Sequence, residues 1–137
     1  MTATGAKVLI VDDDLEFIEF VGKLLVTSGY DVDRALHGAD ALMAIALARP
    51  DVVLLDVRMS GIHGVDVLKR IRSMDPTIPV ILVTADDDPV LISETRQIGA
   101  YGYLVKPFDV DDLARMVGEA VAGTDHREPP DLERSPA

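Results

Sequence analysis

Five polar residues stand where the apolar runs of this sequence end, and their side chains could do chemistry together. They are Asp12, Asp13, Asp56, Thr84 and Lys106. Short runs of Val, Leu and Ile are typical of strands that are buried on both faces of a parallel sheet. Because the carboxyl ends of parallel strands meet at one edge of the sheet, we expect these five side chains to lie close together there.

The chemistry that this set supports is phosphoryl transfer to a carboxylate. Three carboxylates close together raise one another's pKa values unless a cation neutralises them. Carboxylate oxygens, backbone carbonyls and water suit Mg²⁺ or Mn²⁺, and such an ion keeps coordination positions for a phosphoryl group. Lys106 adds an ammonium group and Thr84 adds a hydroxyl donor. Together these groups would stabilise phosphoryl oxygens during transfer to an acid at the sheet edge.

The elements that must position these residues alternate along the chain. The sequence predicts strands over 8–11, 30–36, 52–55, 80–84 and 101–105, and helices over 15–28, 39–48, 65–74, 90–98 and 110–122. This alternation is typical of an α/β protein with a doubly wound parallel sheet, here of five strands with five helices. The run 30–36 alternates polar and apolar residues, which predicts a strand near the sheet edge. Asp14, Asp87 and Asp109 are interpreted as helix caps or turn residues.

The composition of the chain limits which class of protein it can be and which partners it can bind. The 137 residues, of which 48% are hydrophobic, fit one domain on the usual scale of ~100–200 residues. The net charge of -11 disfavours direct binding of nucleic acid or of anionic membrane surfaces. No apolar run approaches the ~20 residues of a membrane span, so we expect no membrane insertion and a cytoplasmic location. The polar stretch 123–137 is predicted to be a disordered tail or a linker stub.

Four motifs resemble a known family, the receiver domain of two-component response regulators. The motifs are Val-Leu-Ile-Val-Asp12-Asp13-Asp14, Val-Val-Leu-Leu-Asp56-Val-Arg-Met59, Val-Thr84-Ala85 and Tyr103-Leu-Val-Lys106-Pro107-Phe108. They occur in the family's order and spacing, and the resemblance covers residues 7–122. It implies a flavodoxin-like sheet with the strand order 2-1-3-4-5.

The resemblance implies a role for each matching residue. Asp56 would be the phosphoacceptor, which takes a phosphoryl group from the phosphohistidine of a sensor histidine kinase or a phosphotransfer protein. Asp13 and Asp56 would bind Mg²⁺ through their side chains, Asp12 through water and Arg58 through its backbone carbonyl. Lys106 would pair with a phosphoryl oxygen.

The family also implies a switch. Thr84 would move toward the phosphoryl group, and Tyr103 would swing inward into the space that it leaves. The change would reach a downstream protein through the face of the fourth helix, fifth strand and fifth helix, as a shift between two packings. Such a protein is not an enzyme with a separate substrate, because it catalyses only its own phosphoryl transfer and autodephosphorylation.

Two positions that tune the lifetime of the acyl phosphate in this family carry Arg58 and Asp86 here. We hypothesise that these side chains pair across the site and slow the access of hydrolytic water. The alternative is a solvated surface pair with little effect.

Two other functions fit the predicted fold less well. A small Mg²⁺-dependent phosphohydrolase with an aspartyl nucleophile would normally carry a second acid two residues after the nucleophile, where this chain has Arg58. A flavin-binding electron carrier needs a loop after the first strand that accepts a phosphate, and the acids at 12–14 would repel one.

Overall fold

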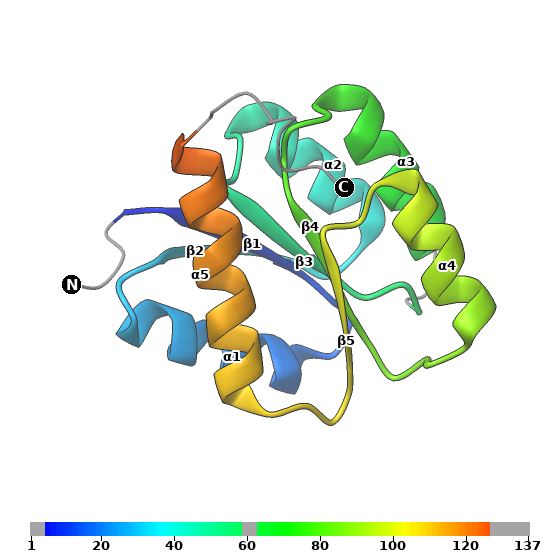
Figure 1. Ribbon diagram of the computed structural model, residues 1–137. Coiled ribbons are helices and arrows are strands. Elements are labelled where there is room, and N and C mark those ends of the chain that lie inside the picture. Colours follow the sequence, from blue (N-terminus) through cyan, green and yellow to red (C-terminus); the bar gives the residue numbers. More distant parts are fainter. Residues whose placement is uncertain (1–4, 59–62, 127–137) are drawn as a thin grey trace.

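A parallel sheet forms the centre of the molecule (Figure 1). The computed structural model describes residues 5–58 and 63–126. Within these ranges, the strands are β1 (Lys7–Val11), β2 (Asp31–Ala35), β3 (Val52–Leu55), β4 (Val80–Thr84) and β5 (Gly102–Val105). Their order in the sheet is β2-β1-β3-β4-β5 and every neighbouring pair is parallel, which confirms the predicted fold class and strand order. The edge position predicted for the second strand is also correct.

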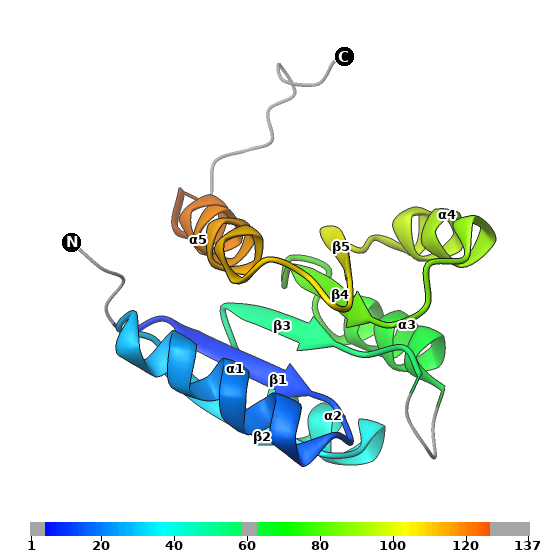
Figure 2. The same ribbon diagram turned by 90° about the horizontal axis from the view of Figure 1, so that it is seen from below.

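Helices cover both faces of the sheet (Figure 2). They are α1 (Leu15–Thr27), α2 (Gly38–Leu47), α3 (Gly64–Met74), α4 (Pro89–Ile98) and α5 (Val110–His126). The helices α1 and α5 pack on one face, and α2, α3 and α4 pack on the other. Among the described residues, no helix combines the length and the apolar character required to cross a membrane.

The strands are apolar on both sides because each face of the sheet has its own core. In β1, Val8 and Ile10 pack with α1 and α5, whereas Leu9 and Val11 pack with the helices of the opposite face. All four side chains are at most 1% exposed. Successive side chains of a strand point to opposite faces, so a sheet covered on both sides requires an unbroken apolar run.

Short polar side chains fix where the helices begin. Asp14 caps α1, and the Asp109 carboxylate accepts a hydrogen bond from a backbone N–H in the first turn of α5. At α4 the cap is Asp88, whose side chain accepts from the Val90 N–H, and the helix begins at Pro89, one residue earlier than predicted. His63 caps α3, with its Nδ1 accepting from the Val65 N–H at 3.2 Å.

The last helix is longer than the sequence predicts. Helix α5 ends at His126, four residues beyond the expected end at 122. Its buried stripe of Val117, Ala120 and Val121 anchors the helix, and each further residue then adds one backbone hydrogen bond for little extra cost. The rest of the expected tail, 127–137, lies outside the described residues.

Candidate functional site

The carboxyl edge of the sheet brings together four of the five residues from the sequence analysis. Asp12 follows β1, Asp56 follows β3, Thr84 ends β4 and Lys106 follows β5. In the sheet, Val11 is paired with Leu55 and Thr84 with Val105, so β1 ends level with β3 and β4 ends level with β5. The prediction that these strand ends share one edge is confirmed, and direct contacts between side chains join Asp12, Asp56 and Lys106.

The ammonium group of Lys106 lies between two carboxylates. Its Nζ is 2.8 Å from Asp12 Oδ2 and 3.4 Å from Asp56 Oδ2. Burial would lower the pKa of Lys106, but the hydrogen bond to Asp12 and the charges of both acids outweigh burial and raise it. Burial raises the pKa of Asp12, against the opposing effect of the Lys106 hydrogen bond. The lysine therefore remains a cation and partly offsets the negative charge of the site.

Backbone groups hold Asp56 in place in addition to Lys106. Its Oδ1 accepts a hydrogen bond from the Arg58 N–H at 2.8 Å, and its backbone N–H donates to Val11 O at 3.0 Å. Asp56 is 7% exposed and Asp12 is 1% exposed. Of the two acids that Lys106 contacts, Asp56 is thus the more accessible to a reactant.

A glycine allows the start of α3 to lie very close to the residue that follows Asp56. A Cβ atom at Gly64 would lie 2.2 Å from Val57 Cα, closer than any side chain can come to a backbone. The Gly64 N–H donates to Val57 O at 3.2 Å. This contact fixes the start of α3 against the residue that follows Asp56.

Two of the acids predicted to bind the cation lie together in the structure. Asp12 and Asp56 meet at Lys106, but Asp13 is exposed at the surface. Within 5–58 and 63–126, no three His, Asp or Glu side chains lie together in a way that could hold one metal ion. The chemistry of the donor set still suits a hard divalent cation, because two carboxylates at adjacent strand ends have a third acid next to them in the chain. The Mg²⁺ site stays a prediction.

Thr84 and Tyr103 are linked through the loop between β4 and α4. Thr84 is fully buried, and its Oγ1 accepts a hydrogen bond from the Asp86 N–H at 3.4 Å. The Tyr103 hydroxyl donates to Asp86 O at 2.7 Å. Burial, followed by the nearby charge of Asp86, raises the pKa of Tyr103 to about 12. A movement of Thr84 would therefore act directly on the loop segment that Tyr103 holds.

Arg58 and Asp86 form the ion pair that the sequence analysis hypothesised. The Arg58 Nε lies 2.6 Å from Asp86 Oδ2, and a second guanidinium nitrogen contacts the same oxygen. Hydrogen bonds from the Asp88 N–H and from Arg58 lower the pKa of Asp86. The side chain of Arg58 is 58% exposed, so the pair lies at the surface of the site. Its effect on the lifetime of a phosphoryl group stays a prediction.

The sequence analysis missed the aromatic side of the site. The Lys106 Nζ lies 4.1 Å from the ring centroid of Phe17. The ring of Phe108 meets Phe17 edge to face, with centroids 6.1 Å apart and an interplanar angle of 85°. Phe17 belongs to α1, and its apolar character alone is equally consistent with packing in the core. Only the contact in three dimensions identifies it as part of the site.

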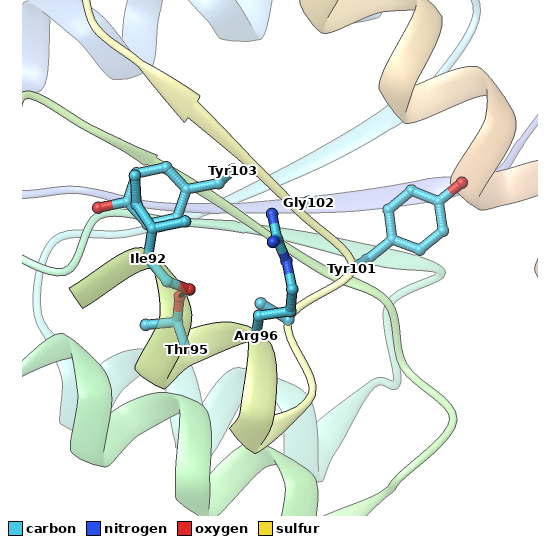
Figure 3. A pocket seen from close by; sticks show the side chains of 7 residues that line it. Ile92, Thr95, Arg96, Tyr101, Gly102 and Tyr103 are labelled. Atoms are coloured by element: carbon cyan, nitrogen blue, oxygen red, sulfur yellow. Dashed lines mark hydrogen bonds between the residues drawn. The ribbon is translucent and has the colours of Figure 1, made fainter. Parts of the chain in front are cut away.

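A small pocket lies beside Tyr103, between α4 and β5 (Figure 3). Its volume is about 40 Å³, and its lining residues are Ile92, Thr95, Arg96, Ala100, Tyr101, Gly102 and Tyr103. Figure 3 shows Arg96 reaching from α4 toward β5, between the two tyrosines. This volume is far below the ~300–1,000 Å³ that is typical of pockets for organic ligands.

Known proteins resemble this chain in sequence and in fold. A family model described as the response regulator receiver domain matches residues 8–118. Over 111 residues the chain is 36% identical to sporulation initiation phosphotransferase F of Bacillus subtilis, a match that covers 81% of this chain and 90% of that protein. It is also 36% identical to the DNA-binding transcriptional regulator NtrC of Escherichia coli, over 90% of this chain. That match covers 26% of NtrC, so the chain spans about a quarter of that regulator's length.

A solved structure agrees with the fold. It is a CheY-like response regulator receiver domain protein from Methanospirillum hungatei, which superimposes with a TM-score of 0.87. The alignment covers 91% of this chain and all of that one, at 23% identity. At that identity the likeness concerns the arrangement of the strands and helices.

Proposed function

We propose, from the premise that this chain belongs to the response regulator receiver domain family, that Asp56 accepts a phosphoryl group and thereby switches the protein's contacts. The observation that carries the proposal is the ammonium of Lys106, 2.8 Å from Asp12 and 3.4 Å from Asp56. An ammonium group at this place can neutralise a phosphoryl oxygen as soon as the phosphoryl group is on Asp56. The family membership supports a signalling role rather than turnover of a separate substrate.

The proposed transfer is a displacement at phosphorus. A carboxylate oxygen of Asp56 forms a bond to phosphorus while the bond from phosphorus to the histidine nitrogen of the donor breaks, and the electron pair of that bond stays on the nitrogen. The product is an acyl phosphate. The proposed donor is a sensor histidine kinase or a phosphotransfer protein, and the proposed location is the cytoplasm.

The acids at the edge of the sheet would hold the divalent cation. Asp13 and Asp56 would bind Mg²⁺ or Mn²⁺ through their carboxylates, Asp12 through water, and Arg58 through its backbone carbonyl. When bound, the ion would neutralise the charge on the phosphoryl oxygens. The two carboxylates beside Lys106 support this assignment, because one ammonium does not balance two buried acids and a phosphoryl group.

The readout begins at Thr84. Its hydroxyl would turn toward a phosphoryl oxygen. Because this hydroxyl accepts a hydrogen bond from the Asp86 N–H, the turn would displace the segment at Asp86, whose carbonyl accepts from the Tyr103 hydroxyl. Tyr101 and Tyr103 line the pocket between α4 and β5, and Tyr101 is 47% exposed. Val90, near the start of α4, is 73% exposed. We propose this face, with α5, as the contact surface for a downstream protein, because exposed apolar and aromatic side chains are common in protein interfaces.

The ion pair of Arg58 and Asp86 supports a role in the lifetime of the acyl phosphate. Arg58 follows Asp56 by two residues, and its backbone N–H is bonded to the Asp56 carboxylate. Its guanidinium is tied to Asp86 across the site, so the pair covers an approach to the phosphoryl group. Arg58 is always a cation and cannot act as the general base of a phosphohydrolase, which disfavours that alternative.

The test is phosphorylation with a small-molecule phosphodonor in the presence of Mg²⁺. Wild-type protein should take up label, chelation by EDTA should abolish the uptake, and Asp56→Ala should take up none. The variant Lys106→Met should fold and take up label more slowly. Uptake that is the same with and without EDTA, or the same in Asp56→Ala, would refute the proposed function.

A further inference from the structure

A closed ring of contacts joins Lys106, Asp12, Asp14 and Phe17. The Asp12 Oδ1 accepts a hydrogen bond from the Asp14 N–H at 2.9 Å. The Asp14 carboxylate caps α1 and accepts from the Phe17 N–H at 3.3 Å. The ring of Phe17 lies against the ammonium group of Lys106, and this ammonium group donates a hydrogen bond to Asp12 Oδ2. Asp12 thus contacts both Lys106 and the start of the helix that carries Phe17.

The two sides of the ammonium differ in chemistry. Asp12 and Asp56 contact it as carboxylates, and Phe17 contacts it as an aromatic ring 4.1 Å away. A cation within about 6 Å of a ring centroid is attracted by the negative charge of the ring face. The ring also restricts a side chain whose stem has four rotatable carbons.

The ring is itself held in place. Phe108 follows Lys106 by two residues and meets Phe17 edge to face at 6.1 Å. Both rings pack against the core beneath α1 and α5. Edge-to-face pairs are favourable beyond the area that they bury. Phe17 is thus fixed by the loop that carries the lysine and by its own helix.

We propose that Phe17 is a positioning residue for phosphoryl transfer, which holds the Lys106 ammonium where it meets a phosphoryl group on Asp56. The proposal rests on the proposed function. A third carboxylate at this place would also hold the lysine, but it would compete with the phosphoryl group for the positive charge. An aromatic face attracts the ammonium and leaves its charge available to a phosphoryl oxygen.

The experiment compares three variants in the full chain. Phe17→Leu keeps an apolar side chain of similar reach and removes the ring, Phe17→Tyr restores a ring face, and Phe20→Leu is the matched control. Phe20 lies on the same helix and is 55% exposed. Each variant is measured for its rate of phosphorylation by a small-molecule phosphodonor with Mg²⁺. Urea unfolding of each variant reports whether the fold is intact.

A second readout is independent of phosphorylation. Protons that lie over an aromatic ring resonate upfield, so the ε-methylene protons of Lys106 are followed by NMR in each variant. We expect their upfield shift in the wild type, in Phe17→Tyr and in Phe20→Leu, and its loss in Phe17→Leu. This pattern tests whether the ring of Phe17 lies over the side chain of Lys106 in solution.

The expected rates follow the same order. Phe17→Leu should react about threefold to tenfold more slowly than wild type, equivalent to about 0.6–1.4 kcal/mol at 1.36 kcal/mol per factor of ten. Phe17→Tyr should recover most of the rate, and Phe20→Leu should match wild type. Equal rates for Phe17→Leu and wild type would overturn the inference and leave the proposed function intact. If wild type takes up no phosphoryl group, the proposed function fails and the positioning role fails with it, whatever the NMR shift shows.

Discussion

Removing the hydroxyl of Tyr103 should weaken the attachment of β5 to the loop after β4. In Tyr103→Phe the hydrogen bond to Asp86 O, 2.7 Å long in the structure, is lost. A hydrogen bond of this kind contributes about 0.5–1.5 kcal/mol net. We therefore expect the free energy of unfolding at pH 7 to fall by about 1 kcal/mol.

The same hydroxyl predicts a dependence on alkaline pH. The pKa of Tyr103 is raised from 10.0 to about 12, so folding favours its neutral form. The stabilisation is complete below pH 10 and is lost as the pH rises from 10 to about 12. At 1.36 kcal/mol per pKa unit the displacement corresponds to about 2.7 kcal/mol, and solvent screening of this partly exposed side chain reduces it to about 1 kcal/mol.

The assay is a titration of tyrosinate absorbance, combined with urea unfolding at pH 7 and pH 11. Subtracting the titration curve of Tyr103→Phe from that of wild type leaves the signal of Tyr103 without those of Tyr30 and Tyr101. The difference should show a midpoint near pH 12, and the stability advantage of wild type should shrink between the two pH values. Tyr101→Phe, which removes the hydroxyl of a neighbouring tyrosine that is 47% exposed, is the control. A midpoint near pH 10 together with equal stabilities of wild type and Tyr103→Phe would refute the reasoning.

Three further predictions concern other parts of the structure. Arg58→Ala and Asp86→Ala should each speed autodephosphorylation about threefold, or about 0.7 kcal/mol, and the double variant should be no faster; an unchanged rate in Arg58→Ala contradicts the lifetime role. Gly64→Ala should lower the free energy of unfolding in urea by about 1–3 kcal/mol, whereas Gly123→Ala, where an added Cβ has open space, should not. The hydrogen bond from the Thr77 hydroxyl lowers the pKa of Asp75 to about 2, so the stabilisation is present above pH 4 and lost as the pH falls toward 2. The loss of stability between pH 6 and pH 3 should be smaller in Asp75→Asn than in wild type, by a measurable amount below about 1 kcal/mol. An equal loss in the two proteins would contradict the assignment.

The parts of the fold that depend on buried apolar runs were predictable from the sequence. The run that ends at Asp56 and the run that ends at Asp12 must each be buried on both faces, which allows little except neighbouring strands of a parallel sheet. Once those strands are parallel, the polar residues at their ends share one edge. The convergence of Asp12, Asp56 and Lys106 follows from that pattern.

Other features depend on contacts that a linear pattern does not encode. Phe17 has the same apolar character as a core residue, and its contact with Lys106 depends on the angle at which α1 meets the sheet. His63 lies just before α3, and nothing in the linear pattern indicates that its Nδ1 caps this helix. The extension of α5 to His126 crosses a glycine, because packing of the earlier turns outweighs local propensity.

The central claim is that Asp56 is the residue that carries the phosphoryl group. The most direct measurement is mass spectrometry of the intact protein and of its peptides after reaction with a small-molecule phosphodonor and Mg²⁺. We expect one added phosphoryl group per chain, located on the peptide that contains Asp56, removed by hydroxylamine and absent from Asp56→Asn. A stable phosphoryl group on another residue, or equal modification of Asp56→Asn, would contradict it.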